Sequence, residues 1–400
     1  MSLMACTSAD PRPPAEASSP AKSSAPAESP APAATPPSDA PKPTGDCTLT
    51  ARTVAAPTLH ADLLAVAPQY FHGTHRGGFD AYSGGKTFPW FDRHQLDAPV
   101  LSPPGARIAA STATRLLPVK HSGELGHLPR EGGRPTWLGK KLYPEEAIDG
   151  ANGTTWVLAR SGRTWQVVEL DAEGKVKVHD LGIAETTHDV RIAINHAQRP
   201  AAAWLAREGG QLSVHLAMDF DVSTATVVDA VTVPDGVAEL SHRTGVNLAL
   251  VAQGPDALAV AWRPLVDQKY TDFGSRSKPP STPAAAEVRW RTLDADGSRS
   301  TVHVHPTSAQ PLGFTSGIGP WALRGNGMKS GSLGRDAPGV FVWLDDEVVR
   351  GVRADQDTTV ALTEREGSPL LAPRATSADP LQLLLFDSSP RVRALALDCR

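Results

Sequence analysis

The segment 70–94 carries the residues of this sequence that could hold a metal ion. Its histidines and aspartates are His72, His75, Asp80, Asp92 and His94. A metal site needs several such groups to converge on one ion at about 2 Å. Two histidines three positions apart in a loop are more often ordinary polar residues. We therefore expect no metal ion and no cofactor in this protein.

The same segment could instead line a site for an organic ligand or a partner. Ligand sites are concave and mostly apolar, with a few polar groups that fix orientation. Tyr70, Trp90 and Phe91 would form apolar walls, and His72 or Asp92 would supply polar contacts. The many glycines predict a long loop over one end of the fold. The alternative is a loop that packs its own aromatic rings onto a sheet face.

Two further histidines, His303 and His305, alternate in the run VHVH. Side chains two positions apart in a strand lie on the same side of it, so we expect both on one solvated face. The run 325–330 lacks the spacing of a phosphate-binding P-loop. The sequence contains no G-x-S-x-G, C-x-x-C or H-E-x-x-H motif, so neither an α/β-hydrolase nucleophile nor a zinc site of these types is indicated.

These residues must be positioned by β-structure, because the sequence repeats a pattern of short strands. In 189–219, three apolar runs are separated by the turn-forming sequences NHAQRP and EGG. Alternation with a period of two is the signature of a strand, and Asn, Pro and Gly favour turns. The same scheme returns later in the chain, with Trp204, Trp262 and Trp343 in equivalent places.

Repeated four-stranded units are typical of a β-propeller. We predict an all-β fold, a propeller of six blades, with five or seven blades or a β-sandwich as alternatives. The tryptophans would lie on inner strands and fill the space between neighbouring blades. The run YPEEAID at 143–149 is expected to form one or two helical turns. The six blades are expected at 96–137, 138–182, 186–234, 242–306, 314–364 and 368–399.

Two short motifs resemble part of the Asp-box, the hairpin motif S-x-D-x-G-x-T-W of sialidase-type propellers. They are Gly153-x-Thr155-Trp156 and Gly162-x-Thr164-Trp165. The Asp position is occupied by Ala151 in the first and Arg160 in the second. The resemblance therefore implies a propeller hairpin and does not imply sialidase activity.

Composition limits the classes of function. The chain has 400 residues, a net charge of −4 and a pI of about 6.4, so no nucleic-acid partner is expected. No apolar run reaches 18 residues, which excludes an ordinary membrane-spanning helix from the sequence. We expect a monomer with a large core in residues 47–400.

The N-terminus predicts attachment to a membrane. Leu3-Met4-Ala5-Cys6 resembles a bacterial lipobox, in which the cysteine is lipidated, although no signal-peptide h-region precedes it. Residues 7–46 contain 28 Pro, Ala or Ser among 40 residues, a composition that favours a disordered, partly extended tether. The predicted organisation is a lipobox remnant at 1–6, a linker at 7–46 and a propeller at 47–400.

This resemblance to secreted bacterial lipoproteins implies a location in the cell envelope. Thr7, rather than aspartate, follows the cysteine, which by analogy with enterobacterial sorting implies the outer membrane. The alternative is a chance cysteine in a cytosolic protein.

A disulfide between Cys47 and Cys399 is also predicted. If Cys6 carries lipid, these are the two remaining cysteines, one at each end of the folded region. In a closed propeller the N-terminal strand completes the last blade, so 47–54 would pair with 391–398. An oxidising compartment would let the bond persist. Two unrelated cysteines are the alternative.

The function predicted from these features is a membrane-tethered binding or scaffolding module with a protein or glycan ligand. It resembles propeller-bearing bacterial lipoproteins, most of which have no assigned activity. The alternative is a glycan-active hydrolase or lyase, with carboxylates around the central channel. A cluster of Asp or Glu with His or Arg at one mouth of the channel would favour the enzyme.

Overall fold

The computed structural model is built from strands, with two single-turn 3-10 helices, η1 (Ala151–Gly153) and η2 (Val222–Thr224), among the residues described. The compact unit Pro43–Arg400 holds all of these strands. None of the described residues belongs to a helix long and apolar enough to cross a bilayer. The structure describes residues 48–56, 70–73, 78–83, 86–87, 91–92, 100, 102–184, 189–208, 210–232, 248–264, 287–294, 297–307, 329–332, 338–345, 348–364, 368–372, 381–386 and 392–399.

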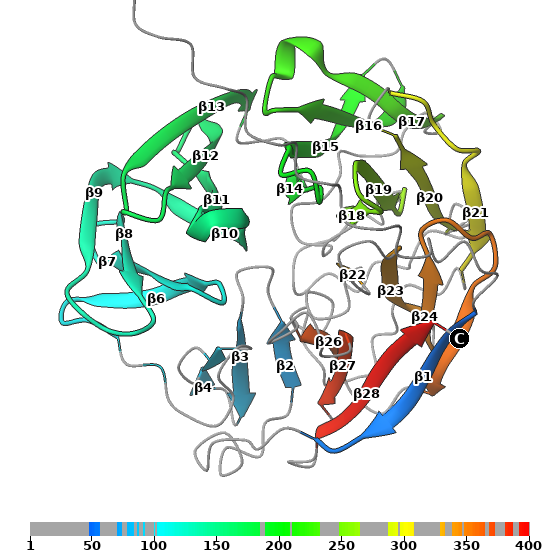
Figure 1. The fold of residues 1–400 in the computed structure, drawn as a ribbon, viewed down its shortest axis with the longest axis horizontal. Helices are drawn as coiled ribbons and strands as arrows, with labels where there is room; N and C mark the ends of the chain where they lie inside the picture. The colour runs from blue at the N-terminus through cyan, green and yellow to red at the C-terminus, as the bar shows by residue number, and fades with distance from the viewer. Residues whose placement is uncertain are drawn as a thin grey trace, which may run out of the picture. The chain divides into compact units, whose positions relative to one another are not determined.

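The described strands form seven four-stranded antiparallel sheets (Figure 1). In five of them, four consecutive strands pair in sequence order, which is the pattern of a propeller blade. These sheets are β6–β9 (Ala106–Ser111, Arg115–Lys120, Glu124–Pro129, Thr136–Lys141), β10–β13 (Tyr143–Asp149, Thr155–Arg160, Thr164–Leu170, Val176–Ala184), β14–β17 (Arg191–Ile194, Pro200–Glu208, Gln211–Met218, Thr226–Thr232), β18–β21 (Leu248–Gln253, Ala257–Trp262, Glu287–Leu293, His303–Pro306) and β22–β25 (Lys329–Ser332, Gly339–Asp345, Val348–Arg353, Val360–Glu364).

The sheet formed by β26, β27, β28 and β1 joins the two ends of the compact unit, as the sequence predicted. Strand β1 (Leu49–Val54) pairs antiparallel with β28 (Val392–Cys399), beside β27 (Leu381–Phe386) and β26 (Ser368–Ala372) (Figure 1). Leu49 is fully buried in a cluster that extends into the β22–β25 sheet. Cys399 lies opposite Leu49, whereas Cys6 and Cys47 lie outside the described residues, and the disulfide stays a prediction.

The seventh sheet corrects the prediction of a long loop at 70–94. Strands β2 (Tyr70–Gly73), β3 (Gly78–Ser83), β4 (Lys86–Thr87) and β5 (Phe91–Asp92) pair with one another. The described part of the chain therefore holds seven sheets where six blades were expected. Of the glycines that suggested a loop, Gly73 ends β2 and Gly78 begins β3.

Consecutive sheets lie side by side through their first strands. Strand β6 contacts β10, β10 contacts β14, and the series continues through β18, β22 and β26 to β2. Neighbouring first strands run in the same direction: Arg191 Nε, in the first residue of β14, donates to Leu248 O, in the first residue of β18, at 3.1 Å. Beyond the ends of these two strands, the Ala197 N–H donates to Pro255 O at 2.9 Å. The fold is thus a propeller-like succession of sheets.

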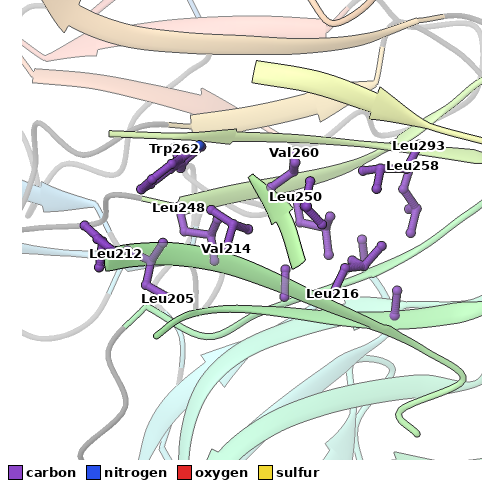
Figure 2. Packing of buried hydrophobic residues seen from close by; sticks show 14 residues of the cluster. Leu205, Leu212, Val214, Leu216, Leu248, Leu250, Leu258, Val260, Trp262 and Leu293 are labelled. Atoms are coloured by element: carbon purple, nitrogen blue, oxygen red, sulfur yellow. The ribbon is translucent and has the colours of Figure 1, made fainter. Parts of the chain in front are cut away.

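The hydrophobic core is divided into clusters between successive sheets. One cluster joins β15 and β16 to β18, β19 and β20 through residues including Leu205, Val214, Leu250 and Trp262 (Figure 2). Trp204 and Trp343 occupy the corresponding clusters on either side of this one. All three tryptophans lie on the second strand of a sheet and face the preceding sheet, which confirms that they fill the space between sheets.

Residues 143–149 form strand β10 rather than the predicted helical turns. Pro144 and Ala147 are buried against neighbouring strands, and the side chain of Glu146 accepts a hydrogen bond from the Ile192 N–H of β14 at 2.9 Å. Local helix propensity is weak compared with such tertiary pairing, so the two glutamates of this run do not decide its conformation.

Candidate functional site

The residues predicted to bind a ligand are placed by the β2–β5 sheet. Tyr70 and His72 lie on β2, and Phe91 and Asp92 on β5, while Trp90, His75 and His94 lie outside the described residues. In the register, His72 is opposite Asp80 and Asp92 is opposite Gly78. His72, Asp80 and Asp92 therefore hold positions on one face of the sheet, and Phe91 holds a position on the other. Within the described ranges, no group of three or more His, Cys, Asp or Glu residues could hold a metal ion.

The sheets from β6 onward have two different ends. We call the end with the turns between first and second strands the hairpin end, and the opposite end the linker end, because it carries the links to the next sheet. Hydrogen bonds join neighbouring sheets at the hairpin end. Asn195 Nδ2 donates to Asp256 O at 2.8 Å, the Ala151 N–H donates to Gln198 Oε1 at 2.6 Å, and the Gly339 N–H donates to Gln253 Oε1 at 2.6 Å.

Asp149 extends this hydrogen-bonded series toward the β6–β9 sheet. Its carboxylate accepts from the Thr114 N–H at 3.1 Å, Thr114 Oγ1 at 2.8 Å and Thr155 Oγ1 at 3.0 Å. Since Thr155 is fully buried, its hydroxyl needs this internal partner. The polar groups of the hairpin end thus hold sheets together.

The longest connections between strands lie at the linker end. From β6 to β28, the three longest connections are 233–247, 263–286 and 307–328. They precede β18, join β19 to β20 and follow β21, so all three border one sheet, β18–β21. In β scaffolds, recognition residues are concentrated on connections of this kind, which the rigid sheets position.

An ionic network lies between the β14–β17 and β18–β21 sheets near this end. Asp229 Oδ2 accepts from Trp262 Nε1 at 2.8 Å and from Arg289 Nε at 2.7 Å. Arg289 Nη1 also donates to Glu287 Oε1 at 2.8 Å. The hydrogen bond to Asp229 raises the pKa of Arg289. The carboxylate of Asp229, with 8% of its side chain exposed, is thus committed to its neighbours.

A second network lies between the β18–β21 and β22–β25 sheets and corrects the expected place of the VHVH histidines. His303 stacks on Trp290 with ring centroids 5.5 Å apart, and His305 lies 6.0 Å from Trp343. Both therefore share one side of β21, as predicted, but that side packs against indole rings. The exposed side of β21 carries Val304 instead.

The series Thr359, His305 and Asp345 has the residue types of a nucleophile relay. His305 Nδ1 is 3.4 Å from Thr359 Oγ1, and His305 Nε2 is 3.6 Å from Asp345 Oδ2. The second distance is too long for a hydrogen bond. Arg350 Nε donates a hydrogen bond to the same Asp345 oxygen at 2.8 Å. This arrangement can hold two sheets together and does not orient a general base.

The first Asp-box-like motif leads into strand β11, and the second spans the turn from β11 into β12. Gly153 and Gly162 adopt φ values of +74° and +89°, which glycine reaches without a steric cost. Trp165 is buried between sheets, whereas Arg160, at the Asp position of the second motif, pairs with Glu145. The motif therefore keeps its turn and its tryptophan packing while the acidic position has been replaced.

One exposed feature was missed by sequence reasoning. Tyr143 at the start of β10 is 47% exposed and lies against Gly123 in the β7–β8 turn, while Trp137 of β9 lies over Gly126 of β8. The signal in the sequence is the pair of glycines, which leave room for the two rings. Neither aromatic residue belongs to the repeat that directed attention to Trp204, Trp262 and Trp343.

Comparisons with known proteins give no protein-family match and no match among curated sequences. Solved structures do show similarity. The N-terminal domain of Nup159 is 13% identical, with 89% of this chain and 97% of that chain covered and a TM-score of 0.38. An apocarotenoid oxygenase of Synechocystis is 11% identical, with coverage of 89% and 90% and a TM-score of 0.41. A DUF4221 member from Bacteroides vulgatus is 10% identical, with coverage of 88% and 99% and a TM-score of 0.31.

Proposed function

We propose that the seven sheets close into a seven-bladed propeller, which a lipid on Cys6 and the linker 7–46 tether to the bacterial cell envelope, and that this propeller binds a protein or glycan. The observation that carries the proposal is the length of the connections at the linker end, since hydrogen bonds join neighbouring sheets at both ends. The longest connections leave from the linker end around β18–β21.

The position of β1 supports the tether. Strand β1 begins at Leu49, directly after the Pro/Ala/Ser-rich residues 7–46, and its pairing with β28 joins the start of the compact unit to its last strand. A force on the tether would be transmitted to the domain through the hydrogen bonds between β1 and β28. Such an attachment suits a domain held at a distance from a membrane.

The alternative, a glycan-active hydrolase or lyase, has weaker support. A general acid or base must exchange a proton with the substrate. Asp229 and Asp345 in the two networks nearest the linker end instead accept hydrogen bonds from arginine side chains. Carboxylates paired in this way hold neighbouring sheets together.

Two measurements test the proposal. When the gene is expressed with its upstream codons, we expect the wild-type protein in the membrane fraction and the Cys6→Ala variant in the soluble fraction. A Cys6→Ala variant that stays in the membrane fraction would contradict the lipid anchor. The released Cys6→Ala chain should bind at least one member of a panel of purified envelope glycans without shortening it. Shortened chains in the mass spectrum would favour the enzyme.

A further inference from the structure

An exposed surface at the linker end of the β6–β9 sheet combines an aromatic ring with an ion pair and further lysine side chains. We call it the Tyr143 surface; it consists of Tyr143, Lys120, Glu124, Lys140 and Lys141, with Trp137 beneath Lys120. It includes the turn between β7 and β8, which lies at the same end as the longest connections. Tyr143 is the most exposed of the large apolar side chains among the described residues, at 47%.

Two glycines let the aromatic rings lie against the backbone. A Cβ at position 126 would stand 2.7 Å from Cε3 of Trp137, and a Cβ at position 123 would stand 3.0 Å from Oη of Tyr143. Gly123 also has a φ of +86°, which a residue with a side chain rarely adopts. The hydroxyl end of the Tyr143 ring thus lies against the turn, while 47% of the residue is exposed to solvent.

Lys120 is held by its neighbours rather than free to move. Its Nζ lies 4.4 Å from the ring centroid of Trp137, a cation–π contact, and donates to Glu124 Oε2 at 2.6 Å. The ammonium group has three donors, so it keeps capacity for a ligand. The hydrogen bond from Lys120 lowers the pKa of Glu124.

A bulge in β9 lies beside Glu124 and is followed by two exposed lysines. The register between β8 and β9 shifts between Glu124, opposite Lys141, and Gly126, opposite Trp137. The extra residues include Gly139 with a φ of +68°, whose N–H donates to Glu124 Oε1 at 3.1 Å. Bulges often redirect side chains next to functional sites. Lys140 and Lys141, exposed beside this bulge, make the Tyr143 surface net positive.

The geometry points to a binding site for an acidic glycan, one whose sugar rings carry carboxylates. The exposed face of Tyr143 can stack against the apolar face of a sugar ring, and Glu124 can accept hydrogen bonds from sugar hydroxyls. Lys120, Lys140 and Lys141 can donate charge-assisted hydrogen bonds to the sugar carboxylates. This inference deepens the proposed function, since it gives the propeller a ligand class and a place to bind it.

Titration calorimetry of the full Cys6→Ala chain with oligogalacturonate tests the site. The chain with an unchanged Tyr143 surface should bind oligogalacturonate saturably, and this binding should weaken as salt is added. The methyl-esterified oligosaccharide, which lacks the charge, should bind at least tenfold more weakly. Tyr143→Ala should weaken binding by about tenfold or more, the effect of removing one aromatic anchor. Tyr143→Phe should retain most of the binding, because the stacking face remains.

Lysine variants separate this site from general charge attraction. The double variant Lys140→Gln with Lys141→Gln should weaken binding and reduce its salt dependence, whereas Lys175→Gln with Lys177→Gln, on the next sheet, should leave binding unchanged. Equal binding of polyglutamate, or binding that survives Tyr143→Ala in a folded variant, would overturn the glycan site. If another envelope glycan binds and the Tyr143 variants do not affect it, the binding function stands and this site is wrong.

Discussion

Leu49 of β1 and Cys399 of β28 face each other in one antiparallel ladder. The next pair in this ladder, Thr50 and Asp398, is separated by 348 positions in the sequence. A contact of such long range is the structural link between the start and the end of the compact unit. It also places β1, which follows the Pro/Ala/Ser-rich residues 7–46 in the sequence, at the edge of the sheet formed with β26, β27 and β28.

Removing the Leu49 side chain should destabilise the protein strongly. Leu49 is fully buried with Val342, Leu383 and Leu397, so Leu49→Ala leaves a cavity between two sheets. We expect a loss of about 2–5 kcal/mol in the free energy of unfolding, measured by urea denaturation. Thr53→Ala, at an exposed position of the same strand, serves as the control and should change stability little.

The predicted disulfide between Cys47 and Cys399 can be measured directly. Cys399 is opposite Leu49, two residues after Cys47 in the sequence, and a bond there would close a loop of almost the whole folded region. The chain-entropy model gives about 4–5 kcal/mol for a loop of this length. Mass spectrometry of the non-reduced protein, isolated from the bacterial cells that make it, should find the cross-linked peptide; two free thiols in that sample would refute the disulfide.

His127 should make the protein less stable in acid. The side chain is 5% exposed, and its Nδ1 lies 3.2 Å from Nη1 of the buried Arg115. Burial, and then the charge of Arg115, lower the pKa of His127 from the usual 6.5. Because the unfolded chain then binds the proton more tightly, this stability is complete above pH 6.5 and is lost as the pH falls toward the folded-state value.

Urea denaturation at a series of pH values from 7 to 5 would measure this effect. In His127→Gln the loss of stability on acidification should be smaller than in the wild type, since a neutral side chain replaces the titrating one. His121→Gln, which changes an exposed histidine, is the matched control. Identical pH profiles for wild type and His127→Gln would show that His127 does not titrate with unfolding.

The buried and exposed ion pairs should differ in their contribution. Asp229→Ala leaves Arg289 and the Trp262 indole N–H without their shared acceptor between two sheets, and we expect a cost of about 3–5 kcal/mol. Asp398→Ala breaks the Arg52–Asp398 pair, whose arginine side chain is 51% exposed, and should cost at most about 1 kcal/mol. Equal costs in urea denaturation would contradict the structural role given to Asp229.

The sequence predicted the all-β class and much of the sheet pattern because alternation reports burial directly. Val190, just before β14, and Ile192 and Ile194 within it alternate with the residues between them. Trp204 lies on β15, the strand that pairs with β14. The pairing of β1 with β28 was also predicted, from the requirement that a ring of blades must close. Both successes rest on patterns that a sheet imposes on its own residues.

The failures concern residues whose surroundings come from other sheets. Glu146 looked helical, yet its carboxylate binds the Ile192 N–H of the next sheet. His305 looked solvated, yet it packs against Trp343. The glycines of 70–94 suggested a loop, yet four short strands form there. Tyr143 and Trp137 were missed because their importance depends on Gly123 in the β7–β8 turn and Gly126 in β8.

The most direct test of the binding module compares the two ends of the sheets. In one variant of the full Cys6→Ala chain, a short Gly-Ser insertion is placed between His121 and Ser122, in the β7–β8 turn of the Tyr143 surface at the linker end; in the other, an insertion of the same length is placed between Asp294 and Gly297 at the hairpin end. We predict that both variants fold, that the first loses binding to the envelope glycan panel, and that the second retains it. Equal binding by both variants, or loss only in the second, would contradict recognition at the linker end.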